Sequence, residues 1–372
     1  MYKRQVFGKD GLVHSLDMLG SIANNRAIIP ILANILIDAK HSGILFEAAN
    51  MELSARVQAI GIVQQEGRFT VSAQRFANTI KELPPGEISI KLIDDKHFRI
   101  EADGGVYHLA GLPPDEYPEY PRTEGDPISV EGNELRTIVK RTLFAAGGEA
   151  NPNLDAVHFV FSDECTTAVA SNRVCISIAT CSPVTETNIE KVTITRKSIT
   201  EMLRIFAGSY EMTITTQEAS ATISDGVNTL VVRVIDPESF PKFDAVLEQT
   251  FDKITTIDRL KFIALLKRVS TLADPRNYLV NIKISEKEIT ATCKTPSLGD
   301  ASDSIPFDES NGEIEINLNS RILLKLLANI ESTSIHLAYS ESVNPLVVES
   351  TTTVPTDLHK CMLMPLRPEW QS

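Results

Sequence analysis

Cysteine is scarce in this sequence, and its positions have none of the spacings that disulfide frameworks or zinc sites need. The five cysteines, an odd number without a C-x-x-C pair, are Cys165, Cys175, Cys181, Cys293 and Cys361. The seven histidines are scattered, with no spacing typical of metal ligands. We therefore expect reduced, buried thiols, and we predict neither a metal site nor a cofactor.

Long apolar runs are also missing. The longest run, from Ala27 to Ile37, is interrupted by Pro30 and Asn34. It is much shorter than the roughly 20 residues that cross a bilayer. The first ten residues carry several charges and are not followed by the apolar stretch of a secretory signal. We therefore expect a cytoplasmic protein without a membrane partner.

Sequence motifs of common catalytic sites are absent. The sequence contains no GxxxxGK[ST], GxGxxG, HExxH or GxSxG pattern. Cys175 with His158 suggests a thiol nucleophile and its base. However, Cys175 lies in an alternating apolar run, which is typical of a buried structural thiol. We predict a protein that is not an enzyme, and an enzyme of unrecognised type stays open as an alternative.

What the sequence does contain is an internal repeat. Residues 112–120 (LPPDEYPEY) are matched by residues 235–243 (IDPESFPKF), 123 positions later. A second pattern, an alternating strand that leads into a helix, occurs at residues 69–76, 192–199 and 314–321. The spacing is close to one third of the 372 residues, so the repeat unit has the size of a domain. We predict three sequential domains of one fold, residues 1–124, 125–250 and 251–372.

Each third has two segments with helical periodicity and several short alternating strands, which together predict an α+β domain. The helical segments are residues 8–23, 73–83, 131–146, 195–207, 256–273 and 317–330. The clearest strands are residues 43–48, 97–102, 212–216 and 278–284. Ser72, Thr195 and Asn317 or Asn319 stand where helix N-caps are needed. Proline-rich residues 113–127 and 237–241 lie where consecutive domains should join.

Charge is distributed unevenly between the helices and the rest of the chain. The protein has a net charge of −13, which argues against an outer surface coated with nucleic acid. The six helical segments nevertheless contain 15 Lys and Arg against 7 Asp and Glu, whereas the remainder contains 21 against 42. Amphipathic helices often expose basic residues for solubility alone. The pattern also fits a basic, helix-lined surface that holds phosphates without reading sequence.

Several motifs, in order along the whole chain, resemble the bacterial DNA polymerase III β sliding clamp family. Residues 26–34 (RAIIPILAN) are similar to the R-x-x-x-P-I-L-x-N stretch of the first clamp domain, and residues 50–53 (NMEL) are similar to a D-L-E-M-like run. Residues 240–243 (FPKF) resemble F-P-D-Y, and residues 364–367 (MPLR) resemble the C-terminal M-P-M-R. The resemblance implies a sliding-clamp fold with two helices packed on antiparallel sheets in each domain.

The resemblance further implies a head-to-tail homodimer that forms a six-domain ring around double-stranded DNA. Such a processivity factor tethers the DNA polymerase III alpha subunit and other polymerases or repair factors, is opened by a clamp loader, and is associated with the nucleoid. By position, Tyr107 and Leu109 of one subunit should meet Thr271 and Leu272 of the other. Ordinary core packing is the alternative role of these four residues.

The resemblance also implies a hydrophobic groove between the second and third domains that binds partner peptides in an extended conformation. The residues that match its wall are Leu154, Ser171, Arg173, Val174, Ile176, Pro241, Val246, Asn319, Val343, Pro345, Met364, Pro365, Leu366 and Arg367.

Basic residues, all but Arg26 on the helical segments, are the expected DNA-facing groups. They are Arg26, Arg75, Lys81, Arg136, Lys140, Arg141, Arg196, Lys197, Arg204, Lys267, Arg268, Arg321 and Lys325. Arg26 and the Arg196–Lys197 pair match family motif positions, and the others follow from helix placement and charge. Exposure outside the hole and ion pairing are the alternative roles of these side chains.

The chain departs from the family pattern beside the groove. Residues 171–176 (SNRVCI) replace the family's T-D-G-H-R-L, and a gapped alignment places Arg173 and Val174 on its R-L. Ala245 replaces an arginine that follows F-P-D-Y, and the chain continues to Ser372 with Trp370 in this extension. A divergent clamp paralogue with altered partners is therefore an alternative to the replicative clamp.

Overall fold

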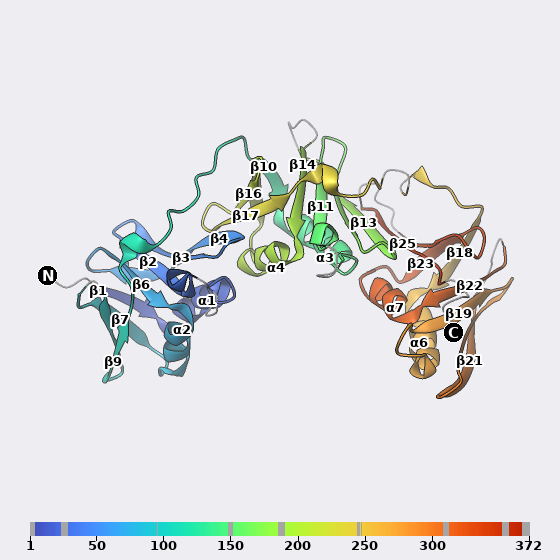
Figure 1. Ribbon diagram of the computed structural model, residues 1–372, viewed down its shortest axis with the longest axis horizontal. Coiled ribbons are helices and arrows are strands. Elements are labelled where there is room, and N and C mark those ends of the chain that lie inside the picture. The colour runs from blue at the N-terminus through green and yellow to red at the C-terminus, as the bar shows by residue number, and fades with distance from the viewer. Residues whose placement is uncertain are drawn as a thin grey trace. The chain divides into compact units, whose positions relative to one another are not determined.

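The computed structural model describes residues 4–23, 29–94, 96–147, 152–184, 190–243, 246, 248–307, 312–351 and 357–366. The chain divides into two compact units, residues 1–133 with 197–234 and residues 134–196 with 235–372. Among the described residues, no helix is both long and apolar enough to cross a membrane. Figure 1 shows the elements of both units, with the helices and many of the strands labelled.

The first unit contains two sheets with helices packed on them. Its strands are β1 (Arg4–Gly8), β2 (Asn34–Lys40), β3 (Gly43–Ala49), β4 (Leu53–Ala59), β5 (Gly61–Val63), β6 (Gly67–Ser72), β7 (Glu87–Leu92), β8 (His97–Ala102), β9 (Gly105–Ala110), β10 (Ile128–Glu131), β15 (Glu211–Thr216), β16 (Ser220–Ser224) and β17 (Thr229–Ile235). Its helices are α1 (Lys9–Leu19), α2 (Ala73–Glu82) and α4 (Arg196–Ile205). Short 3-10 turns occupy Pro30–Ala33 and Pro114–Glu116.

The strands of the first unit pair in two orders. One sheet runs β5-β1-β7-β8-β9, and the other runs β10-β15-β16-β17-β4-β3-β2-β6. The pairing of β17 with β4 is antiparallel and joins segments from the first and second thirds of the chain. Helices α1 and α2 pack against each other and lie next to each other in Figure 1. The repeated thirds are therefore linked by continuous sheet in this unit.

The second unit repeats this arrangement. Its strands are β11 (Ala156–Phe161), β12 (Thr166–Ser171), β13 (Cys175–Cys181), β14 (Glu190–Thr195), β18 (Lys253–Asp258), β19 (Leu279–Ile284), β20 (Glu288–Thr295), β21 (Gly299–Pro306), β22 (Ile314–Asn319), β23 (Ser334–Tyr339), β24 (Leu346–Ser350) and β25 (His359–Leu363). Its helices are α3 (Gly132–Leu143), α6 (Arg259–Val269) and α7 (Ser320–Ala328). Short 3-10 turns occupy Pro152–Leu154, Pro237–Ser239 and Ser270–Leu272.

The second unit, like the first, contains two sheets. Their orders are β18-β23-β24-β25-β13-β12-β11-β14 and β21-β20-β19-β22. The antiparallel pairing of β13 with β25 joins the second and third thirds of the chain. Helices α6 and α7 pack together, as Figure 1 shows in orange and red. The expected α+β fold with two helices per repeat is confirmed in the part of the chain that the structure describes.

Local sequence explains the helix ends and faces. In α2 the side chains of Phe76 and Ile80, four positions apart, are fully buried, whereas Asn78 between them is exposed. Asn319 Oδ1 accepts a hydrogen bond from the Ile322 backbone N–H at 3.0 Å and caps α7. Ser72 occupies the N-cap position of α2 but makes no side-chain cap hydrogen bond, so the expected capping role of Ser72 is wrong.

Candidate functional site

An apolar cluster lies in the second unit where the second and third repeats meet. Leu154 and Phe240 are buried in a cluster against which the half-buried Ile176 and Val246 pack. Ile176 and Val246 also pack against a second cluster that contains Met362 of β25. The two clusters thus share Ile176 and Val246. We call the residues Leu154, Ile176, Val246, Met362 and Met364 the Ile176 surface.

The end of the described chain borders the Ile176 surface. The Met364 backbone N–H donates to the Val174 carbonyl at 2.8 Å, and the Leu366 N–H donates to the Asn317 carbonyl at 2.8 Å. These two bonds connect the segment after β25 to the β12–β13 turn on one side and to β22 on the other. Leu366 is buried, whereas Met364 is 41% exposed. The backbone therefore presents the Met364 side chain to solvent beside Ile176.

The departure from the family pattern at residues 171–176 forms an ordered turn. Asn172 Oδ1 accepts hydrogen bonds from the Val174 and Cys175 N–H groups at 3.1 and 2.8 Å. Ser171 Oγ donates to the Cys175 carbonyl at 3.2 Å. Arg173 has a φ of 73°, in the left-handed region, and its side chain is exposed. The turn therefore directs the Arg173 side chain into solvent.

The structure places the other predicted groove residues in several roles. Pro241 is exposed, Pro345 is half-buried, and Val343 is 72% exposed in the turn between β23 and β24. Asn319 caps α7 and also donates from Nδ2 to the Asn277 carbonyl at 2.8 Å, so both ends of its amide are used within the fold. Arg367 lies outside the described residues. The groove role of all these residues stays a prediction.

Met362 is a member of the Ile176 surface that sequence reasoning missed. All five residues of β25 are buried, so the strand has no alternation that would single out one side chain. Met362 is opposite Ile176 in the antiparallel pairing of β13 with β25. The sequence signal that could have identified Met362 as a member of this surface is its position two residues before the MPLR motif.

A buried polar cluster lies on the other face of the same strand pair. Ser177 Oγ donates to the Arg141 carbonyl at 2.8 Å, and Ser177 Oγ lies 3.2 Å from His359 Nε2. Burial, and then the Arg141 charge, lower the pKa of His359 to about 4. Burial raises the pKa of Cys361, 3.2 Å from Ser177 Oγ, to about 12. At neutral pH, His359 is therefore uncharged and Cys361 is a thiol.

Cys175 and His158, which the sequence suggests as a thiol nucleophile and its base, do not form a catalytic dyad. Cys175 is 2% exposed, and burial raises its pKa well above the ordinary value, which disfavours the thiolate. His158 is stacked on Phe240 with 4.9 Å between the ring centroids, and its Nδ1 lies 2.8 Å from Thr193 Oγ1. Both residues serve the core of the second unit.

In the first unit, the predicted DNA-facing residues lie on α2 and α4. Arg75 is exposed, and Lys81 forms an ion pair with Asp17 at 2.7 Å. Lys197 pairs with Glu52 at 2.7 Å, and Arg204 contacts Glu201 and Ser21. Arg26 lies outside the described residues.

In the second unit, four predicted DNA-facing residues are held by acidic or aromatic neighbours. Arg141 is 12% exposed and pairs with Asp357 and Glu331. Arg196 Nε lies 2.5 Å from Asp155, and Arg268 Nε lies 2.6 Å from Asp303. Arg321 lies over the Tyr278 ring.

The remaining predicted DNA-facing residues of the second unit lie on α3, α6 and α7. Arg136 is half-buried, whereas Lys140, Lys267 and Lys325 are exposed. These three lysines have no ion-pair partner in the described part of the chain. A DNA-facing role for any of the basic residues stays a prediction.

The predicted dimer residues lie at two free sheet edges. Tyr107 is 41% exposed and Leu109 half-buried on β9, the last strand of its sheet. Thr271 and Leu272 follow α6 in a 3-10 turn that packs on β20 and β21, and β21 is the last strand of its sheet. Their meeting across a subunit interface stays a prediction.

Three α+β repeats, with helices packed on antiparallel sheet that continues from one repeat into the next, form the architecture of a sliding-clamp subunit. Family models named DNA polymerase III beta subunit, N-terminal domain, and DNA polymerase III beta subunit, C-terminal domain, match residues 6–121 and 244–367. The chain belongs to the DNA polymerase III beta subunit family. It is accordingly a non-catalytic processivity subunit rather than an enzyme.

Individual relatives and solved structures agree with this family. The chain is 26% identical over 364 residues to the beta sliding clamp of Halalkalibacterium halodurans, with 93% of this chain and 95% of the relative covered. It resembles the crystal structure of the Bacillus subtilis sliding clamp with a TM-score of 0.91 and 22% identity, over 99% of this chain and 100% of the other. A Pseudomonas aeruginosa clamp bound to griselimycin matches with a TM-score of 0.92 and 19% identity, over the same shares.

Proposed function

We propose that two copies of this chain close head to tail into a ring that encircles double-stranded DNA without sequence preference. The observation that carries this proposal is the repeated pairing of sheet edges between successive repeats, which leaves β9 in the first unit and β21 in the second without a partner strand in the described part of the chain. Free edges of this kind favour association with another strand. A head-to-tail contact closes into a ring when its rotation does.

The basic helices are the proposed DNA-facing surface. Exposed lysines and arginines such as Arg75, Lys140, Lys267 and Lys325 attract phosphates, and such contacts are weak and screened by salt. Retention on DNA therefore comes from closure of the ring rather than from affinity. The proposed division into domains 1–124, 125–250 and 251–372, and a cytoplasmic, nucleoid-associated location, accompany this function.

The test of encirclement compares closed circular DNA with the same DNA linearised. The protein is loaded by a clamp loader and then transferred to high salt. Persistence on circles with rapid loss from linear DNA supports encirclement. Equal loss from both would show ordinary electrostatic binding and would contradict the proposal.

We also infer that the Ile176 surface is the binding site for peptides of the DNA polymerase III alpha subunit, of other polymerases, of repair factors and of the clamp loader. An apolar surface edged by Arg173 and by the Asn319 region suits an extended peptide, because the apolar contacts supply affinity and polar groups set its register. Met364 of this surface and Val343, in the turn between β23 and β24, are exposed apolar side chains that the family resemblance assigns to the groove.

The binding test uses a fluorescent replicative-polymerase tail peptide. Val343→Ala combined with Met364→Ala should weaken peptide binding by at least tenfold, because both exposed side chains are available for contact without supporting the core. Val227→Ala, which truncates a 54% exposed valine of the first unit, is the control. Unchanged binding in the double variant would contradict the site. Absence of peptide binding in the unmodified protein, with retention on circles intact, would favour a clamp paralogue.

A further inference from the structure

Two sheet edges in the described chain have no partner strand, whereas their counterparts in the other repeats are paired. β9 ends the sheet β5-β1-β7-β8-β9, and β21 ends the sheet β21-β20-β19-β22. The corresponding strands meet at β4·β17 in the first unit and at β13·β25 in the second. In the first unit, β4 is the third strand of β2-β3-β4 and pairs antiparallel with β17, the third strand of β15-β16-β17. In the second unit, β13 is the third strand of β11-β12-β13 and pairs antiparallel with β25, the third strand of β23-β24-β25. We call each set of three consecutive strands a meander.

The repeat makes it possible to match residues between junctions. Ser72, Thr195 and Asn319 each stand directly before the second helix of their repeat. Following the strand pairings outward from these three positions makes Ser54, Ile176 and Asp300 equivalent.

The other meander is matched in the same way. Gly8, Glu131 and Asp258 each stand directly before the first helix of their repeat. The pairings from these positions lead to Gly104, Val227 and Leu358. Four residues further along each strand, His108 is therefore equivalent to Val231 and Met362.

The two internal junctions use the same register. Val231 pairs with Ser54 in the first unit, and Met362 pairs with Ile176 in the second. The third junction, between β9 of one copy and β21 of another, has the equivalent residues His108 and Asp300. We propose that the subunit interface pairs β9 with β21 in this register and places His108 directly opposite Asp300. This inference rests on the proposed head-to-tail dimer and adds its register and a specific histidine–carboxylate pair.

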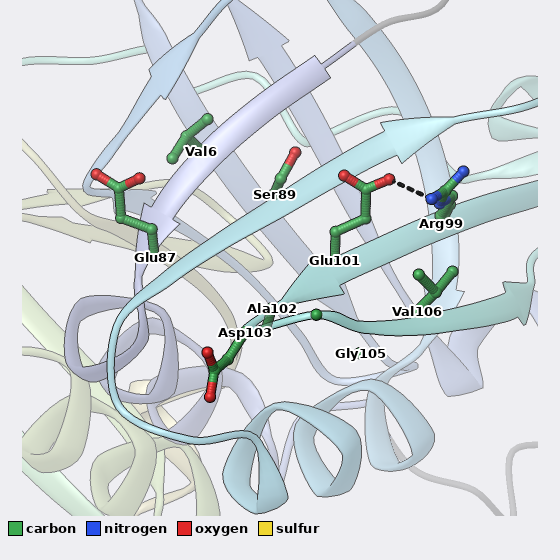
Figure 2. Close-up of a pocket in the computed structure, with 10 residues that line it drawn as sticks. Val6, Glu87, Ser89, Arg99, Glu101, Ala102, Asp103, Gly105 and Val106 are labelled. Atoms are coloured by element: carbon green, nitrogen blue, oxygen red, sulfur yellow. Dashed lines mark ion pairs between the residues drawn. The ribbon is translucent and has the colours of Figure 1, made fainter.

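The charges on both strands suit this register. His108 is exposed and lies opposite Arg99 on β8, which in turn lies opposite Lys91 on β7. Glu101 pairs with Arg99 at 2.6 Å, as Figure 2 shows next to Val106 of the edge strand. A row of basic groups therefore ends at the free edge, where a carboxylate from the second copy is favourable.

Asp300 is that carboxylate. It is exposed and lies opposite Lys294 on β20. Asp303, the other acidic residue of β21, is an odd number of positions away, so its side chain lies on the other face, where it pairs with Arg268. Asp300 is thus the acidic group of β21 that shares a face with His108 once the two strands pair.

The internal junctions have Val231 opposite Ser54 and Met362 opposite Ile176 at this position, whereas the third has a histidine and a carboxylate. A ring must open at one junction to admit DNA, and a polar pair that separates into water exposes no new apolar surface. The same register puts Tyr107 opposite Ala301 and Leu109 opposite Gly299, on the face that includes Leu272. The pair His108–Asp300 therefore distinguishes the junction that opens from the two that stay closed.

The test measures dimerisation of the full chain by sedimentation equilibrium. His108→Asp should raise the dimer dissociation constant roughly tenfold, because two carboxylates then face each other at both interfaces of the ring. Combining it with Asp300→His restores an opposite pair and should return the constant to near its original value. His108→Asp with Ser304→His, which places the imidazole four residues away, is the control and should not restore dimerisation.

A covalent version checks the register independently of charge. His108→Cys with Asp300→Cys should give a disulfide-linked dimer under oxidising conditions, whereas His108→Cys with Ser304→Cys should not. Restoration by the exchange and selective crosslinking support the proposal. A stable dimer in which neither effect occurs would overturn the register while leaving the proposed ring intact. A monomeric unmodified protein would overturn the ring and the register together.

Discussion

At the residue scale, the buried His359 links stability to pH. Burial lowers the pKa of this imidazole to about 4 in the folded chain, against about 6.5 when it is exposed. The unfolded chain therefore binds a proton between these values that the folded chain does not. Stability from this group is complete above pH 6.5 and is lost as the pH falls toward 4.

His359→Gln tests this linkage. Between pH 7 and pH 5, the unmodified protein should lose about 2 kcal/mol more unfolding free energy than the variant, because the variant has no imidazole to protonate on unfolding. Urea unfolding at both pH values measures the difference. Parallel losses in the two proteins would show that His359 is not held neutral.

Asn319 is the second residue whose role the structure makes specific. Its Oδ1 caps α7 and its Nδ2 bonds the Asn277 carbonyl, so Asn319→Ala should lower the unfolding free energy by about 1 kcal/mol or more. Ser72→Ala is a matched control, because Ser72 occupies the same position before α2 without a cap bond. Equal effects of the two substitutions in thermal or urea unfolding would contradict the assigned cap.

Side-chain pairings were the least predictable feature at this scale. The sequence identified Arg141 as a basic helix residue, but not its ion pairs with Glu331 and Asp357, which come from distant parts of the chain. Helical periodicity shows that a residue lies outside the apolar face of its helix. It does not show which acidic side chain from elsewhere in the fold lies close enough to form an ion pair. The same limit applies to Met362, because a strand buried at every position shows no preferred face.

At the element scale, periodicity located all six helical segments, and the structure shortened each of them. The predicted segment 8–23 forms a helix over Lys9–Leu19, and the segment 317–330 forms one over Ser320–Ala328. The residues lost at the start of the second segment belong to β22, whose alternation runs directly into the helix. Apolar spacing defines the middle of an element well, whereas its ends depend on caps and on neighbouring strands.

Gly111 tests how β9 is joined to the rest of its repeat. A Cβ at this position would collide with the Thr70 carbonyl oxygen of β6, and the Gly111 N–H donates to the Lys96 carbonyl at 2.7 Å. Gly111→Ala should therefore lower the unfolding free energy by about 2 kcal/mol, because backbone must shift to make room. Gly208→Ala is the control, since a Cβ there meets no atom within 4 Å. A variant as stable as the control would contradict this packing.

At the scale of the whole molecule, the threefold repeat was visible in the sequence because two motifs recur at nearly one third of the length. The junctions between repeats were not, because strand pairing between distant segments leaves no periodic signal. Ser54 with Val231 and Ile176 with Met362 are paired only in the folded units. These pairings supply the register that the third junction should copy.

Ring closure by two chains is the central claim, and small-angle X-ray scattering of the protein in solution tests it most directly. A closed ring of two chains should give a particle with twice the 40.9 kDa mass of the chain and a distance distribution typical of a hollow disc. A particle with the mass of one chain at all concentrations, or a solid dimer without a central hole, would contradict it.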